Sequence, residues 1–353
     1  MFESFGFETL TAPQAAVYFA LLIGAAFGAL AQITRFCFRR AVMGTDRREA
    51  AGVWFAALAI AALGTQWAVA ADLISFGDHR FMATDLPYAA IILGGLAFGI
   101  GMVLTRGCVS RLTVLGASGN LRAALVIVVF AVVAHATLKG VLAPVRTTLG
   151  AITLPLENAA LPGNGMLWAA IIAILGAGLA LRARLSLRLL VPALLLGALV
   201  PLAWVGTGYV LYDDFDPIAM ESLSFTSPAA ETLFWVLAST SIPAGFGTGL
   251  LGGVILGALV AALLRGEFIW QSFESPAQTG RYMAGAALMG VGGVLAGGCT
   301  VGAGLSGVPT LSVAALLAIA SVAAGGYLAA RGLNEGAFAR AAASPARQPQ
   351  PAE

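Results

Sequence analysis

Three cysteines lie in short segments whose other residues could bring a thiol into contact with a ligand. Cys37 lies in TRFCFRR, Cys108 in GMVLTRGCVSR and Cys299 in GGVLAGGCTVG. A thiol is a soft group that donates only weak hydrogen bonds, so it suits a sulfur-bearing ligand better than a hard oxyanion. In an apolar site the thiol also stays neutral, and a neutral thiol does not repel an arriving anion. The three cysteines are therefore candidate contacts for a sulfur-containing anion.

A second interpretation treats each cysteine as packing. A free cysteine is often a small buried apolar residue, and Cys37 has the aromatic and basic neighbours of an ordinary membrane-interface residue. Cys108 and Cys299 argue against packing alone, because the same Gly-Cys pair ends two apolar segments. Arg106 favours a thiolate at Cys108 whereas an apolar surrounding favours the thiol, so the charge of Cys108 stays open.

The Gly-Cys pairs are expected to interrupt membrane helices. An interrupted backbone at membrane depth is tolerated only inside protein or beside a water-filled cavity. Half-helices starting at Ser110 and Thr300 would direct free N–H groups at the cysteines, an arrangement that attracts anions. The predicted substrate site consists of the cysteines and the residues around two of them: Cys37, Cys108, Cys299, Arg106, Ser110, Thr300, Gly107 and Gly298.

The two Gly-Cys segments align with each other over residues 94–108 and 285–299 without a gap. The identical pairs are Gly94/Gly285, Gly99/Gly290, Gly101/Gly292, Val103/Val294, Leu104/Leu295, Gly107/Gly298 and Cys108/Cys299. Both segments continue into a polar turn and another apolar stretch, which indicates an internal repeat. Loop charges predict that the first segment runs into the cell and the second runs out. The halves are therefore expected to be inverted, a design typical of secondary transporters.

The elements that carry these segments are expected to be membrane helices. Of the 353 residues, 59% are hydrophobic and 10% are charged, against about 25% charged residues in soluble domains. A bilayer crossing needs about 20 apolar residues. Runs of this length are expected at 15–34, 51–71, 88–105, 122–140, 165–182, 189–211, 247–264, 282–297 and 309–330. The sequence thus predicts an all-α polytopic membrane protein with about nine transmembrane helices, and it lacks the short alternating strands of an outer-membrane barrel.

The chain is expected to form a single transmembrane domain. The repeats are placed at about 15–140 and 230–330, with a linking pair of helices at 165–211. Residues 230–242 are too short to cross, so they predict a re-entrant or interfacial segment. The Pro/Ala-rich tail 334–353 is expected to be disordered. The acidic N-terminus lacks the basic start of a signal peptide.

The distribution of arginine predicts the orientation. Cytoplasmic loops carry an excess of Lys and Arg, and residues 35–49 are rich in arginine, whereas 72–87 and 212–222 are acidic. The N-terminus is therefore expected outside and the C-terminus in the cytoplasm. A charge at the bilayer centre costs about 2.5–3.5 kcal/mol, so Arg106 and Arg111 are expected near the cytoplasmic mouth or in a polar cavity.

Other polar features have two interpretations each. His135 and Lys139 lie four residues apart, and form either a proton or ion relay or the outer end of a span, where long side chains reach water. Residues 213–228 are either an external lid or a solvated loop. Residues 245–249, GFGTG, are a weak phosphate-loop signal that we discount. Three dispersed cysteines and two histidines make no metal-ligand pattern, so neither metal nor cofactor is expected.

Taken in order along the chain, three segments resemble the YeeE/YedE family of sulfur-compound transporters. They are ALAQITRFCFRRAV (29–42), GLAFGIGMVLTRGCVSRLTVLGASGNLRA (95–123) and GAALMGVGGVLAGGCTVGAGLSG (285–307). The resemblance implies an hourglass-shaped, inverted-repeat bundle in the bacterial inner membrane. It implies that Cys37, Cys108 and Cys299 line a narrow path and pass the substrate along by S–H contacts. It also implies a small cytosolic sulfurtransferase as partner. Arg106 departs from the small residue that the third segment has at this place.

The leading prediction is an inner-membrane permease that imports thiosulfate or a related sulfur-containing anion, with no nucleic-acid partner. The alternative is a membrane thiol enzyme that acts as a persulfide carrier or redox relay. An enzyme needs a thiolate activated by a base or cation, and Cys108 has cations nearby in sequence but no histidine. A structural scaffold leaves the paired glycine breaks unexplained.

Overall fold

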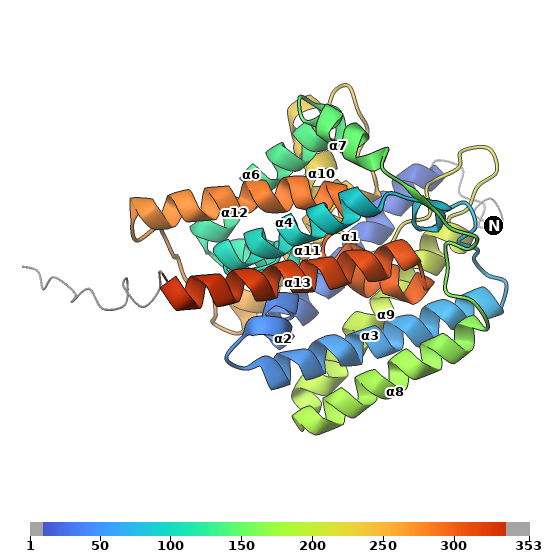
Figure 1. Cartoon of the computed structure of the whole chain (residues 1–353), viewed down its shortest axis with the longest axis horizontal. Coiled ribbons are helices and arrows are strands. Elements are labelled where there is room, and N and C mark those ends of the chain that lie inside the picture. The colour runs from blue at the N-terminus through green and yellow to red at the C-terminus, as the bar shows by residue number, and fades with distance from the viewer. Residues whose placement is uncertain (1–9, 337–353) are drawn as a thin grey trace, which may run out of the picture.

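A computed structural model of the chain describes residues 10–336 as an almost entirely helical bundle (Figure 1). In this part of the chain, nine helical spans are long and apolar enough to cross a membrane. The prediction of an all-α polytopic membrane protein is therefore confirmed. The spans are built on α1 (Ala12–Thr34), α3 (Arg47–Ala70), α4 (Tyr88–Leu104), α6 (Leu121–Lys139), α8 (Gly165–Ala183), α9 (Leu187–Val205), α11 (Phe246–Leu264), α12 (Pro276–Leu295) and α13 (Val313–Gly336).

Shorter elements connect the spans or continue them after a break. The short α-helices are α2 (Phe38–Met43), α5 (Val109–Ala117), α7 (Ala143–Gly150) and α10 (Thr226–Ala238). The 3-10 helices are η2 (Arg80–Met82) and η5 (Val308–Thr310), and the π-helices are η3 (Gly206–Val210) and η4 (Thr300–Gly307). Strands β1 (Asp85–Leu86) and β2 (Leu154–Pro155) pair antiparallel.

The short segment expected at 230–242 is α10, a helix of 13 residues that is not among the nine spans. It starts a turn earlier than expected and ends before Pro243. Neither α7 nor the strand pair was expected from the sequence pattern. Of the tail expected to be disordered, residues 334–336 belong to α13, and 337–353 lie outside the described residues.

Local sequence explains where several helices begin. Asn120 starts α6, because its side-chain oxygen accepts the N–H of Ala123, which satisfies a free donor of the first turn. Ser275 does the same for Gln278 in α12. Pro13 lies in the first turn of α1, where its missing N–H costs nothing. The 23 residues of α1 give about 35 Å at 1.5 Å per residue, enough to cross a bilayer core of about 30 Å.

Glycines let the two helices that carry the Gly-Cys pairs approach closely. A Cβ at Gly101 of α4 would lie 2.5 Å from the carbonyl oxygen of Gly285 of α12, and one at Gly94 would lie 2.6 Å from the nitrogen of Ala296. Residue numbers rise along α4 as they fall along α12, so the two helices are antiparallel and side by side (Figure 1). Matched helices of an inverted repeat have this relation; the repeat itself stays a prediction.

Candidate functional site

Three buried thiols meet inside the bundle although they come from distant segments. Cys37, Cys108 and Cys299 are at most 3% exposed and none forms a disulfide. The sulfur atoms of Cys37 and Cys108 lie 3.9 Å apart. Ser110 Oγ lies 3.3 Å from Cys108 Sγ, and the Thr300 side chain also reaches this thiol. Thr300 directly follows Cys299, so Ser110 and Thr300 of the two breaks share one site with the thiols.

Each cysteine directly precedes a short helix. Cys37 is the N-cap residue of α2, Cys108 of α5 and Cys299 of η4. The Sγ of Cys299 accepts the N–H of Gly302 at 3.4 Å, so this thiol satisfies one of the donors that a helix start leaves free. The half-helices thus start at Val109, one residue before the expected Ser110, and at the expected Thr300.

Glycine is required beside two of the thiols because other backbone or side chains approach there. A Cβ at Gly298 would lie 2.9 Å from the nitrogen of Ala303, and one at Gly107 would lie 3.1 Å from the side chain of Leu112. Contacts under 3.0 Å are not tolerated by a real Cβ and those just above are tight. The glycines therefore let the chain fold back onto its own next helix, which keeps the cysteines buried.

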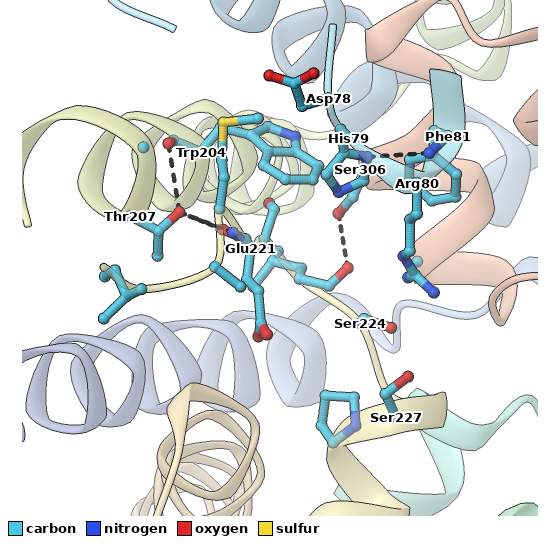
Figure 2. A pocket seen from close by; sticks show the side chains of 18 of the residues that line it. Asp78, His79, Arg80, Phe81, Trp204, Thr207, Glu221, Ser224, Ser227 and Ser306 are labelled. Carbon is cyan, nitrogen blue, oxygen red and sulfur yellow. Dashed lines mark hydrogen bonds between the residues drawn. The ribbon is translucent and has the colours of Figure 1, made fainter. Parts of the chain in front are cut away.

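A cavity of about 620 Å³ opens beside η4, and we call it the Arg80 cavity (Figure 2). The segments between α3 and α4 and between α9 and α11 form most of its wall. Gly302 and Ser306 of η4 also line it, so the cavity reaches the helix that Cys299 starts. The charged lining residues are Asp78, Arg80, Glu221 and Glu231, and the lining also includes His79, Tyr212 and Ser224.

Burial changes the titration of groups in the Arg80 cavity. Burial, helped by the nearby Glu231, raises the pKa of Glu221 to about 7. Burial also raises the pKa of Glu231. For His79 burial lowers the pKa to about 4, and its Nδ1 accepts the N–H of Phe81 at 3.2 Å. At neutral pH the histidine is therefore uncharged, and the pKa of Glu221 lies within the physiological range.

A second cavity of about 500 Å³, the Arg111 cavity, is lined by Arg111, which interacts electrostatically with the other two thiols. Its lining includes Arg35, Arg40 and Arg111 against Asp46 and Glu267. The carboxylates are already engaged: Asp46 forms an ion pair with Arg40, and Glu267 pairs with Arg265 and accepts a hydrogen bond from Gln32.

Arg111 differs from the other arginines of this cavity. Its Nη1 is buried and has no hydrogen-bond partner among residues 10–336. Its guanidinium is close enough to Cys37 and Cys108 to interact electrostatically with them. A buried guanidinium N–H without a hydrogen-bond partner is costly, and an anion beside the two thiols would satisfy it.

Arg106, the arginine preferred on sequence grounds, lies elsewhere. Its side chain is exposed and lines neither of the two cavities. Its φ is +60°, and the matched Gly297 has φ +75°. Both residues therefore end their helix in the left-handed conformation, which glycine adopts without strain. Sequence reasoning could have preferred Arg111, since it follows Cys108 by three residues and so shares a helix face with it.

Replacing Arg106 with glycine is expected to raise the free energy of unfolding by up to about 1 kcal/mol. A side chain in the left-handed region costs about 1–2 kcal/mol, part of which the greater chain entropy of glycine offsets. Thermal unfolding of the purified variant in detergent measures the effect. Arg182→Gly, an exposed position within α8, is the matched control and should lose about 1 kcal/mol. Equal losses for both variants would contradict the strain at Arg106.

The structure bears on His135, Lys139 and segment 213–228, for which the sequence allowed two interpretations each. His135 stacks on Phe234 at a ring-centroid distance of 4.9 Å, and Lys139 is exposed at the end of α6. Neither lines either cavity, which disfavours a relay. The segment 213–228 contributes Glu221 and its neighbours to the wall of the Arg80 cavity. Within the described part of the chain, no three His, Cys, Asp or Glu side chains are grouped to hold a metal ion.

Comparison with known proteins identifies relatives along most of the chain. A sequence model for the protein family described as Sulphur transport matches residues 33–328. The thiosulfate transporter TsuA of Spirochaeta thermophila is 28% identical over 322 residues, which cover 84% of this chain and 93% of that protein. The thiosulfate transporter TsuA of Escherichia coli is 26% identical over 317 residues, which cover 81% of this chain and 85% of that protein. The region matched by the family contains all three cysteines, Arg80 and Arg111.

Proposed function

Because the chain belongs to the Sulphur transport family, as its YeeE/YedE-like segments predicted, we propose that it imports thiosulfate or a related sulfur-containing anion. Transport of a sulfur anion is supported by the family and by the names of both relatives. The observation that carries the finer proposal is that three buried thiols connect to two charged cavities, through Gly302 on one side and Arg111 on the other.

The two cavities open on opposite sides of the membrane. The Arg80 cavity is lined by connections between α3 and α4 and between α9 and α11. The Arg111 cavity is lined by connections between α1 and α3, α4 and α6, and α11 and α12. Successive spans alternate in direction, so these two sets of connections belong to opposite faces. The arginine-rich set is cytoplasmic by the positive-inside rule, which puts the N-terminus outside and the C-terminus inside.

The substrate path runs from the Arg80 cavity to the Arg111 cavity. The anion first meets Gly302, whose N–H is hydrogen-bonded to Cys299. Next come Thr300 and Cys108, which interact with each other. Cys37, 3.9 Å from Cys108 between the two sulfur atoms, completes the path toward Arg111.

Chemical selectivity along this path comes from the thiols. A neutral S–H group donates a weak hydrogen bond to the terminal sulfur of thiosulfate without repelling its charge, and no lasting covalent bond is needed. The oxygens of the anion gain charge-assisted hydrogen bonds from an arginine at each end. A small cytosolic sulfurtransferase that receives the substrate at the Arg111 cavity stays our predicted partner.

The alternative, a thiol enzyme, is less well supported. A catalytic thiol needs a base or cation beside it, and the two histidines of the chain contact other groups: His79 bonds to Phe81 and His135 stacks on Phe234. Arg111 is a cation beside Cys37 and Cys108, but it also suits a passing anion. The family and both named relatives favour transport.

Growth of a bacterial sulfur auxotroph on thiosulfate tests the proposed function. Cells that lack their own thiosulfate uptake and carry this protein are expected to grow on thiosulfate as the only sulfur source, and cells with an empty vector are not. Growth on cysteine controls for general fitness. Absence of growth with the protein inserted in the membrane would contradict import of thiosulfate.

A further inference from the structure

We propose that the Arg80 cavity binds a proton together with the incoming oxyanion, with Arg80 contacting the anion and Glu221 taking up the proton. This inference rests on the proposed function and adds a co-substrate to it. It assigns an anion-binding role to Arg80 and a proton-binding role to Glu221, neither of which lies next to a cysteine in the sequence.

Arg80 has its hydrogen-bonding capacity free for a ligand. Its guanidinium lies 5.0 Å from the ring centroid of Phe81, but it forms no hydrogen bond or ion pair within the described part of the chain. Figure 2 shows the Arg80 and Glu221 side chains extending into the same cavity from different segments. An arginine presents a planar fork of donors that fits the oxygens of an oxyanion.

The cavity wall offers a further donor. The Ser224 hydroxyl has no hydrogen-bond partner among residues 10–336. It lies 2.7 Å from where a Cβ on Gly302 would be, and Gly302 donates its N–H to Cys299. An anion held between Arg80 and Ser224 is therefore next to the first thiol of the path.

The carboxylates oppose this binding when they are ionised. Asp78, Glu221 and Glu231 line a cavity whose lining has Arg80 as its cation, so three negative charges would face an anion of the same sign. Asp78 is exposed to solvent, and Figure 2 shows it pointing away from Arg80. Lys139 acts on Glu231 from α6. Glu221 is more enclosed than Glu231. Its negative charge therefore opposes anion binding most strongly among the three carboxylates.

His79 and Tyr212, which also line the cavity, do not change charge near neutral pH. His79 is neutral there, because burial lowers its pKa to about 4. Tyr212 is also neutral, since contact with Asp214 raises its pKa above the ordinary value near 10. Cys299 is the N-cap residue of η4 and interacts electrostatically with Arg80. Glu221, with a pKa of about 7, changes charge within the physiological range.

Protonation and anion binding then favour each other. A bound anion raises the pKa of Glu221 further, so binding near pH 7.5 takes up about one proton. Below pH 7 the carboxyl is already neutral and the anion binds well. Above pH 7 the apparent affinity is expected to fall, with a slope that approaches about tenfold per pH unit well above the pKa, because a proton must be captured first.

Uptake of radiolabelled thiosulfate by liposomes that contain the purified protein tests the inference. The apparent KM of the wild type is expected to rise about fivefold between pH 7 and pH 8, because the protonated fraction of a carboxyl with a pKa of about 7 falls from about one half to about one tenth. Glu221→Gln keeps the shape of the side chain and fixes it neutral, so its KM should stay low and flat from pH 6 to pH 8. Asp216→Asn removes an exposed carboxylate that does not line the cavity. The KM of this variant should depend on pH as the KM of the wild type does.

Either of two uptake results would overturn the inference: a flat KM for the wild type, or a Glu221→Gln variant that keeps the wild-type pH dependence. If Glu221→Gln fails to insert into the membrane, the pH dependence of the wild-type KM tests the inference without the variant. Thiosulfate added to weakly buffered wild-type protein in detergent at pH 7.5 should raise the pH, and an unchanged pH contradicts the inference. If the wild type neither binds nor transports thiosulfate at pH 6, the proposed function fails and the inference fails with it. If the wild type transports thiosulfate at pH 6 and its KM does not change with pH, the inference about proton binding is wrong and the proposed function is still supported.

Discussion

Replacement of Arg111 with glutamine is expected to lower thiosulfate uptake by about tenfold to hundredfold. A charge-assisted hydrogen bond contributes about 1.5–3 kcal/mol, and about 1.4 kcal/mol corresponds to a factor of ten. Nη1 of Arg111 is buried without a partner, so the anion supplies a bond that the protein alone does not make. Arg111→Lys should recover part of the activity, because the charge remains while the planar fork is lost.

Arg106→Gln is the matched control for this prediction. It makes the same chemical change five positions away, on an exposed side chain that lines neither cavity. Its uptake should equal that of the wild type at equal abundance in the membrane. If Arg106→Gln is the variant that loses uptake and Arg111→Gln is not, the anion contact belongs to Arg106, as the sequence first indicated.

The second large effect is expected at Cys299. Cys299→Ala should reduce uptake to the level of empty liposomes, because it removes the thiol that we propose receives the anion from the Arg80 cavity. Cys299→Ser should also transport poorly, since a hydroxyl is a harder donor than a thiol and suits a sulfur atom less well. The measurement is the uptake rate against substrate concentration for the three proteins.

A packing role for Cys299 predicts a different pattern. Ser321→Ala removes one heavy atom from another buried side chain, on α13, where the hydroxyl donates to Leu317. It should leave uptake intact while changing stability by an amount similar to Cys299→Ala. Normal uptake by Cys299→Ala would show that this cysteine only fills space.

The helices were predictable because hydrophobic length dominates their formation. The expected span 88–105 is α4, Tyr88–Leu104, and the span expected at 165–182 is α8, Gly165–Ala183. In lipid every backbone polar group needs an internal partner, so an apolar run of sufficient length has few alternatives to a helix. The short helix α7 has no buried residue, and an element without a buried face leaves no hydrophobic pattern to recognise.

The cysteines were also identifiable, but their surroundings were not. The Gly-Cys pairs mark the breaks within each local sequence, whereas Arg80 and Glu221 are far apart in the chain and share a cavity only after folding. The choice between Arg106 and Arg111 depended on which side of a helix break each residue occupies. Arg106 ends α4 with φ +60° and points outward, while Arg111 lies on α5 beside the thiols.

The central claim is that soft thiols pass a sulfur-containing anion between the two cavities. Competition during uptake of radiolabelled thiosulfate into liposomes at pH 6 tests it most directly. Unlabelled thiosulfate should compete fully, whereas sulfate, which has a similar size and charge but no terminal sulfur, should compete at least about tenfold more weakly. That factor corresponds to about 1.4 kcal/mol of preference for the soft atom. Equal competition by sulfate, or no uptake of thiosulfate above that of protein-free liposomes, would contradict the claim.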